Sequence, residues 1–147
     1  MKEYNFKNIG LNDTGVIIDK ILEYAKPGFT VGLIGNLGAG KTYLASGVLK
    51  RIGINSITSS PTFTLLNQYE IGDKEFIVNH FDMYRISSAE ELESAGYFDY
   101  AGDKNCFNMI EWADKIMKYL PKKKLVIMKI DYSEDIIKRD YNISEYC

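Results

Sequence analysis

Residues 35–42, with the sequence GNLGAGKT, have the residue types and the spacing of a phosphate-binding loop. The glycines allow a tight turn that points successive backbone N–H groups at phosphate oxygens. Lys41 would reach the β- and γ-phosphates of a nucleoside triphosphate, and the Thr42 hydroxyl would bind Mg²⁺. The residues expected to contact the nucleotide here are Asn36, Leu37, Gly38, Ala39, Gly40, Lys41, Thr42 and Tyr43.

Two acidic residues end apolar segments that follow this loop. Asp82 ends the segment FIVNHFD and Glu111 ends the segment FNMIE. Because ligands of open α/β sheets gather at the carboxyl ends of the strands, both carboxylates are expected beside the loop. Asp82 would hold Mg²⁺ directly or through water, and Glu111 would contact the metal or orient the attacking water. The alternative is that each carboxylate caps the turn after its strand. The expected catalytic residues are Lys41, Asp82 and Glu111, and the expected metal ligands are Thr42, Asp82 and Glu111.

Four neighbouring features have both a functional and a structural interpretation. His80 shares a strand face with Asp82 and would position a phosphate or water, although a lone histidine in a strand is more often structural. Arg85 would stabilise a transition-state charge, contact a partner or form a surface ion pair. The hydroxyl-rich segment 59–63 is either a switch that senses a γ-phosphate or a proline turn into a strand. Trp112 is either a core aromatic at a helix start or a surface residue.

A phosphate loop works only between a strand and a helix, and the flanking sequence predicts both. Residues 30–34 form a short apolar run typical of a strand buried on both faces. Apolar residues then recur at helical spacing over 41–52, and an earlier helix is predicted over 13–25.

The remaining chain predicts a mixed sheet. Strand-like stretches over 63–71 and 75–83 flank Gly72-Asp73-Lys74, which indicates an antiparallel hairpin. A short helix is expected from Ser88, a strand over 106–110, a helix over 112–119, a strand over 125–132 and a last antiparallel strand over 136–143. The expected fold class is α/β, a P-loop NTPase-type three-layer fold whose mixed sheet carries an inserted antiparallel hairpin. We expect one ATPase domain over residues 1–147.

The composition argues against several other classes of protein. The chain is 46% hydrophobic and 26% charged, near the globular average, which argues against disorder. The net charge of −2 does not favour a nucleic-acid-binding surface, and Lys122–Lys124 is interpreted as a solvated loop after Pro121. Two cysteines and one histidine do not favour a disulfide framework or a zinc site. No apolar stretch is long enough for a signal or a membrane span, so we expect a cytoplasmic protein without a membrane partner.

The nucleotide is expected to be ATP. No lysine is preceded by Asn or Thr, so the segment that reads guanine in GTP-binding proteins is missing. A small-molecule or nucleoside kinase would need an acceptor pocket and an arginine-bearing lid, for which the sequence offers no insertion. An ATPase fits better, and a kinase or a nucleotide-dependent switch module without useful hydrolysis are the alternatives.

Five segments, in order, resemble those of one family. They are GNLGAGKT, SPTFTLLNQYE, HFDMYRI, ELESAGYFDY and IEWADK, which together with their surroundings cover residues 10–132. The chain thereby resembles the bacterial tRNA threonylcarbamoyladenosine biosynthesis ATPases of the TsaE (YjeE) type. Two departures are Asn36, where the family often has Asp, and Ala95, where it often has Leu. The tail from Asp131 matches weakly.

The resemblance implies a role for the nucleotide. Mg-ATP would be hydrolysed, with low intrinsic activity, to support a two-protein threonylcarbamoyl-transfer complex of the TsaD and TsaB type. That complex forms the N6-threonylcarbamoyl group on adenosine 37 of tRNAs that read ANN codons, so tRNA would be reached indirectly. The resemblance also implies that Lys41, Thr42, Asp82 and Glu111 serve phosphates, metal and hydrolysis, that Thr62 is the switch residue and that Trp112 lies beside the catalytic acid.

Overall fold

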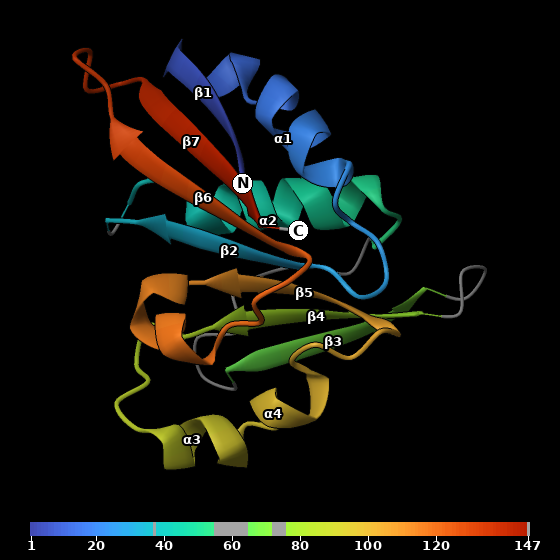
Figure 1. The fold of residues 1–147 in the computed structure, drawn as a ribbon. Coiled ribbons are helices and arrows are strands. Elements are labelled where there is room, and N and C mark those ends of the chain that lie inside the picture. Colours follow the sequence, from blue (N-terminus) through green and yellow to red (C-terminus); the bar gives the residue numbers. More distant parts are fainter. Residues whose placement is uncertain (37, 55–64, 72–75, 147) are drawn as a thin grey trace.

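The computed structural model describes residues 1–36, 38–54, 65–71 and 76–146 (Figure 1). These residues form a mixed seven-stranded sheet with the order β1-β7-β6-β2-β5-β4-β3. The strands are β1 (Lys2–Ile9), β2 (Thr30–Gly35), β3 (Leu66–Ile71), β4 (Phe76–Asp82), β5 (Cys106–Glu111), β6 (Leu125–Tyr132) and β7 (Arg139–Tyr146).

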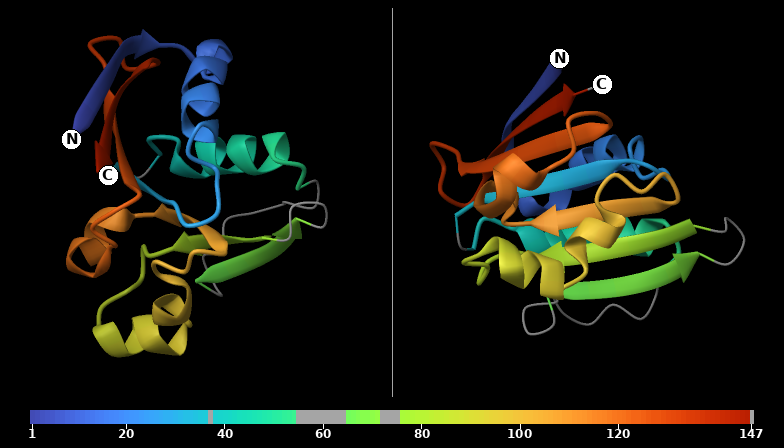
Figure 2. Two further views of the ribbon diagram at one scale, coloured as in Figure 1. Left: turned by 45° about the vertical axis from the view of Figure 1, so that its right-hand side comes forward. Right: turned by 60° about the horizontal axis from the view of Figure 1, so that its bottom comes forward.

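Helices cover both faces of this sheet (Figure 2). They are the α-helices α1 (Gly15–Leu22), α2 (Lys41–Arg51), α3 (Ala89–Ser94) and α4 (Tyr97–Tyr100) and the 3₁₀ helices η1 (Leu11–Asp13) and η2 (Ala113–Tyr119). Apolar residues of α1 and α2, such as Ile17 and Leu44, share one core with β2 and β6, whereas Leu92, Tyr97 and Ile116 form a second core on the other face. The expected three-layer α/β fold is confirmed. No helix in the described segments is long and apolar enough to cross a membrane.

The strand directions bring the predicted site residues together at the carboxyl ends of the central strands. β2 is parallel to β5 and β6, and β5 is parallel to β4, so the carboxyl ends of β2, β5 and β4 lie together. The register pairs Leu33 with Glu111 and Asp82 with Glu111. β3 is antiparallel to β4, which confirms the hairpin expected at this point of the chain.

Four elements differ from the prediction. The strand β1 and the short helix α4 were not expected, because the alternation of apolar and polar residues in β1 is limited to Tyr4 and Phe6 and broken by a register shift before Ile9, and α4 has a single turn. Residues 113–119 are helical, as expected, but they form a 3₁₀ helix that is interrupted by non-helical backbone at Ile116. The last strand begins at Arg139 rather than at residue 136, because the preceding residues form the turn in which Lys138 accepts a hydrogen bond from Ser133 N.

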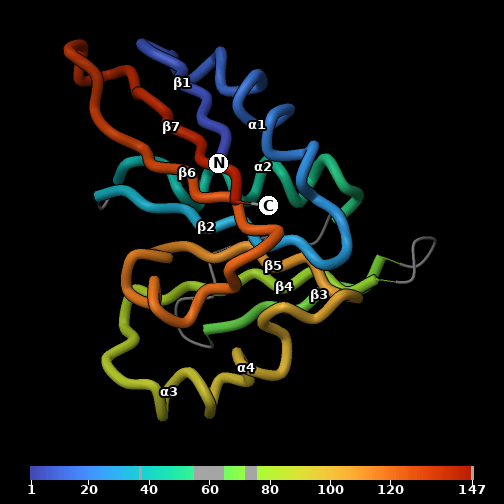
Figure 3. Tube along the Cα trace, in the orientation of Figure 1, coloured from blue at the N-terminus to red at the C-terminus, as the bar shows by residue number. Residues whose placement is uncertain are grey.

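The two ends of the chain lie side by side (Figure 3). β1 pairs with β7 in antiparallel register, with Lys2 opposite Glu145. Both termini therefore lie at the end of the sheet where β2, β5 and β6 begin, away from the carboxyl ends of these strands.

Candidate active site

The loop between β2 and α2 has the backbone that its motif requires. Gly40, the residue before α2, has a φ of 111°, a conformation that side chains with a Cβ rarely adopt. A Cβ at Gly35 would lie 3.0 Å from the carbonyl oxygen of Ile130 and 3.1 Å from the Cβ of Ala39. The loop thus packs closely against β6. The N-terminus of α2 lies at the carboxyl ends of the parallel strands, where its partial positive charge favours an anion.

Lys41 carries a buried positive charge at this loop. Its side chain is only 4% exposed, and its ammonium group donates hydrogen bonds to the carbonyl oxygens of Gly35 and Asn36, the latter at 2.9 Å. Burial lowers the pKa of Lys41, and the nearby carboxylates of Glu111, Asp114 and Asp82 oppose that shift. The side chain therefore bends over its own loop, where an entering phosphate would compete with the carbonyl groups for its N–H donors.

Glu111 is held between the two elements that flank the loop. The residue is 1% exposed; its Oε1 accepts a hydrogen bond from the Thr42 hydroxyl at 2.5 Å, and its Oε2 lies 2.5 Å from His80 Nε2. A carboxylate can only accept, so an ionised Glu111 requires the proton of His80 on Nε2. Each carboxylate oxygen thus has its own partner, and the orientation of the group is determined from both sides.

His80 is fully buried and has no exposed surface. Its other ring nitrogen, Nδ1, has no hydrogen-bond partner among the described residues. An unpartnered buried nitrogen carries a desolvation cost that a merely structural histidine would avoid. The one strong polar contact of the ring is therefore directed at Glu111.

Trp112 follows Glu111 with left-handed backbone, φ 58° and ψ 42°. This conformation is costly for a bulky residue, of the order of 1–3 kcal/mol. It sets the half-buried indole with its ring centre 3.9 Å from the Lys41 ammonium nitrogen and 4.7 Å from the ring centre of Tyr84. Trp112 is thus neither a pure core residue nor a surface residue, because it forms one wall of the cavity beside Lys41.

Asp82 lies on the same strand face as His80, at the end of β4, and is 5% exposed. Its Oδ1 accepts a hydrogen bond from the backbone N–H of Tyr84 at 3.0 Å. The carboxylate therefore caps the turn after its strand and also lines the cavity, so both interpretations of its sequence position apply.

These residues enclose a cavity of about 370 Å³ at the end of the loop. Tyr84 was not predicted as a site residue, and only its alternation with Asp82 in the sequence could have indicated it. The residues that line the cavity are Gly38, Gly40, Lys41, Thr42, Tyr43, Asp82, Tyr84, Arg85, Glu111 and Trp112.

A second cavity, of about 200 Å³, lies on the other side of the same loop and shares Gly38, Gly40 and Tyr43 with the first. No local pattern in the sequence indicated it, because its walls come from both ends of the chain. It is further lined by Ile9, Leu11, Thr14, Ala39, Ile137, Arg139 and Tyr141.

The structure thus brings most of the predicted site residues together at the carboxyl ends of β2, β5 and β4. Asn36 contributes its carbonyl oxygen, and Ala39 lines the second cavity. Leu37, Thr62 and the segment 59–63 lie outside the described residues. In the described residues no cluster of three His, Cys, Asp or Glu side chains could hold a metal ion alone. A cation here would need the Thr42, Asp82 and Glu111 oxygens, which line one cavity, together with oxygens of a ligand, and these are hard donors that suit Mg²⁺.

Comparisons with known proteins assign the chain to a family. The family model of the threonylcarbamoyl adenosine biosynthesis protein TsaE matches residues 10–141. A tRNA threonylcarbamoyladenosine biosynthesis protein TsaE of Haemophilus influenzae is 43% identical over 106 residues, covering 71% of this chain and 64% of that protein. The protein of the same name from Bacillus subtilis is 35% identical over 129 residues, covering 87% of this chain and 78% of that protein.

A solved structure extends the match to the fold. The crystal structure of Bacillus subtilis YdiB superposes with a TM-score of 0.73 and 26% sequence identity, covering 99% of this chain and 87% of that one. The chain spans less than two thirds of the Haemophilus influenzae protein, but the family model covers most of the chain itself. The sequence, the fold and the arrangement of the loop together show that this chain belongs to the TsaE family of threonylcarbamoyl adenosine biosynthesis proteins.

Proposed function

We propose that the chain is an ATPase that binds Mg-ATP and hydrolyses it to support the formation of threonylcarbamoyladenosine in tRNA. The observation that carries the proposal is the chain of contacts from Thr42 through Glu111 to His80, with both contacts at 2.5 Å. It places an oriented carboxylate at the open end of a phosphate-binding loop. This is the arrangement that phosphoryl transfer to water needs.

In this proposal the loop amides and Lys41 hold the β- and γ-phosphates, and Lys41 stabilises the charge that develops as the bond to the γ-phosphorus breaks. Glu111 orients the attacking water and accepts its proton, so that the products are ADP and inorganic phosphate. Thr42, Glu111 and Asp82 are the residues that would hold Mg²⁺. When bound, the metal ion neutralises charge on the phosphate oxygens.

The second cavity is the proposed site of the base and the sugar. It begins at Tyr43, next to the loop, and its walls include the apolar side chains of Ile9, Leu11 and Tyr141, which suit a flat aromatic ring. Thr14 is buried in this wall, and its hydroxyl already donates to the carbonyl oxygen of Leu11 at 2.9 Å. The base would thus bind mainly by apolar contact.

The proposed partners are a two-protein threonylcarbamoyl-transfer complex of the TsaD and TsaB type, with tRNA bound mainly by that complex. The relatives that the chain matches are named for tRNA threonylcarbamoyladenosine biosynthesis, which supports this assignment. The net charge of −2 also agrees with partners that carry most of the RNA contact.

The test is ATP hydrolysis by the purified chain, alone and with the cognate complex. We expect slow release of inorganic phosphate by the chain alone and a clear stimulation by the complex. Turnover that stays the same when the complex is added would contradict the proposed coupling. Phosphate transferred to an added small-molecule acceptor rather than to water would indicate a kinase instead.

His80 provides a more specific prediction about the position of Glu111. We expect His80→Ala to lower kcat about 10- to 100-fold, as loss of an outer hydrogen-bonding residue commonly does. The KM for ATP should change little, because His80 does not line either cavity. His80→Gln should recover part of the rate, since its amide N–H can donate to Glu111 Oε2.

One further measurement and a control variant distinguish this role of His80 from simple structural support. The Mg²⁺ concentration that half-saturates the tryptophan fluorescence change on ATP binding should rise for His80→Ala and recover for His80→Gln. Asn79→Ala is the matched control, because Asn79 is buried in the same strand but donates to Asn108 on the opposite face. Equal losses in His80→Ala, His80→Gln and Asn79→Ala would refute the positioning role.

A further inference from the structure

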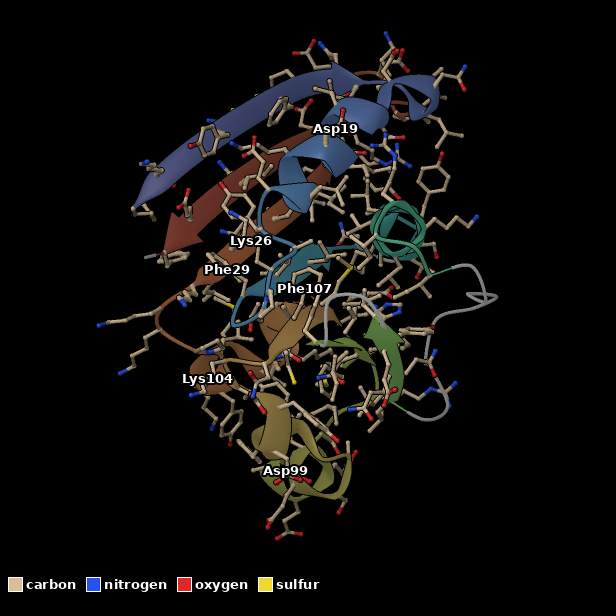
Figure 4. The ribbon with its side chains drawn as sticks, turned by 90° about the vertical axis from the view of Figure 1, so that its right-hand side faces the viewer. Asp19, Lys26, Phe29, Asp99, Lys104 and Phe107 are labelled. Carbon is tan, nitrogen blue, oxygen red and sulfur yellow. The ribbon has the colours of Figure 1, made fainter. Side chains whose placement is uncertain are left out.

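Five lysines from three separate loops gather at the end of the molecule opposite the phosphate loop. Figure 4 looks onto this end, where Lys26 and Lys104 are labelled together with Phe29. We call these residues the lysine surface. Its members are Lys26 after α1, Lys104 before β5, and Lys122, Lys123 and Lys124 before β6.

Contacts between the backbones hold the three loops together. Thr30 N donates to the carbonyl oxygen of Lys124 at 2.9 Å, and Gly28 N donates to that of Cys106 at 2.7 Å. A Cβ placed on Gly28 would lie 3.5 Å from the Lys124 ammonium nitrogen and 3.8 Å from the Cα of Lys104. The grouping therefore follows from the order of β6, β2 and β5 in the sheet, at the ends where these strands begin.

The charges of this surface are exposed and not neutralised. All five side chains are exposed, and none forms an ion pair with a carboxylate of the described residues. Basic residues elsewhere do form such pairs, as Lys7 does with Asp140 and Arg51 with Asp19.

Two acidic side chains adjoin these loops, Asp103 before Lys104 and Glu145 on β7 beside β6; both keep their negative charge, so the five lysines leave a local excess of positive charge. Asp103 accepts a hydrogen bond from Asn105 N at 2.8 Å, and Glu145 accepts one from the Tyr24 hydroxyl at 3.0 Å. In a chain of net charge −2, a group of five ammonium ions at one end is a local positive field. Such a field attracts a polyanion and weakens with added salt.

The residue type favours a nucleic-acid backbone over a protein partner. Lysine is depleted from the centres of protein interfaces, whereas lysine ammonium groups are common phosphate contacts. None of the five lysines lines the two cavities beside the phosphate loop or the one between α3 and η2, so the surface offers charge rather than a means of reading bases.

We propose that the lysine surface binds the sugar–phosphate backbone of RNA without sequence preference. The choice of tRNA as that RNA rests on the proposed function; the recognition of phosphate rests on the charges alone. Because the surface lies at the opposite end from the phosphate loop, RNA and ATP bind at the same time. The chain thereby touches the tRNA directly while the partner complex holds most of it.

The experiment compares two triple variants of the full chain for binding to a fluorescently labelled, unmodified tRNA transcript. The surface variant is K122A/K123A/K124A, and the control is K50A/K118A/K129A, which removes three exposed lysines elsewhere and the same total charge. Fluorescence anisotropy is measured over a series of KCl concentrations, because the slope of log K against log salt counts phosphate contacts.

We expect the unaltered chain to bind with a Kd of about 10⁻⁶–10⁻⁴ M near physiological salt, as nonspecific binders do. The surface variant should bind at least about 10-fold more weakly at low salt, with a salt slope smaller by about 2, whereas the control should not change its slope. Equal binding by both variants, or no binding by the unaltered chain, would overturn the proposal. Binding to phosphatidylserine vesicles that the surface variant loses, with RNA binding retained, would overturn it in favour of a membrane.

ATP hydrolysis of the same variants separates this proposal from the proposed function. The lysine surface takes no part in either cavity, so we expect the surface variant to hydrolyse ATP at the rate of the unaltered chain. If RNA binding is lost in the surface variant while no variant shows hydrolysis with the partner complex, the ATPase proposal fails and the RNA surface stands. If the partner complex stimulates hydrolysis and both variants bind RNA equally well, the proposal for the lysine surface fails and the ATPase proposal stands.

Discussion

Glu111→Gln is expected to slow ATP hydrolysis about 10²- to 10⁴-fold, the usual contribution of a general base, while ATP binding is retained. Glutamine has the size of glutamate, and its amide oxygen can still accept from the Thr42 hydroxyl. Its NH₂ group would face His80 Nε2, which can accept if the ring proton moves to Nδ1, the nitrogen that now lacks a partner. The variant therefore keeps the shape of the site and loses the base.

The measurement is release of inorganic phosphate under single-turnover conditions, with ATP affinity determined by calorimetry on the same sample. Glu93→Gln is a suitable control, because Glu93 is an exposed residue of α3 and the change of charge is the same. Intact hydrolysis in Glu111→Gln would show that Glu111 does not have this role. Loss of both hydrolysis and binding would assign Glu111 to the metal alone.

Lys41→Ala is expected to weaken ATP binding about 10- to 100-fold, because hydrogen bonds from a charged donor contribute about 1.5–3 kcal/mol. The ammonium group of Lys41 is the buried positive charge at the mouth of the loop, and burial makes its interaction with phosphate stronger than on an exposed surface. Stimulation by the partner complex should be lost as well.

Lys50→Ala provides the control for this variant, since Lys50 lies on the same helix but is exposed. Thermal unfolding should accompany the binding measurement, because removal of Lys41 takes one donor each from the carbonyl oxygens of Gly35 and Asn36, of which Asn36 keeps the N–H of Ala39. ATP affinity that is the same in Lys41→Ala and in Lys50→Ala would exclude the phosphate-binding role of the loop.

The elements that carry the site could be predicted because their signals are local. The apolar run 30–34, the glycines of the loop and the helical pattern after Lys41 lie next to one another in the sequence, and the structure has β2, loop and α2 in these places. The apolar segments before Asp82 and Glu111 placed both at strand ends, and the general rule for open α/β sheets placed them beside the loop; their strands are neighbours.

The contacts within the site could not be predicted in the same way. The bond between His80 and Glu111 depends on the register of β4 and β5, which joins residues far apart in the sequence. The left-handed backbone of Trp112 is a costly local conformation that its sequence does not indicate. Lys122–Lys124 alone looked like a solvated loop, and only the sheet order brings Lys26 and Lys104 beside it.

The order of the strands also has a consequence for folding during synthesis. Among the described strands, β1 has one neighbour, β7, which is the last strand of the sheet to be synthesised. Because a chain leaves the ribosome from its N-terminus at about 5–20 residues per second, β1 has no strand to pair with until β7 has emerged. Strands β2 to β5, with the loop and Glu111, can form their pairs before that. The most N-terminal strand of this sheet is therefore among the last to join it, and until then Tyr4 and Phe6 depend on the flanking Lys2 and Lys7 to discourage pairing with other chains.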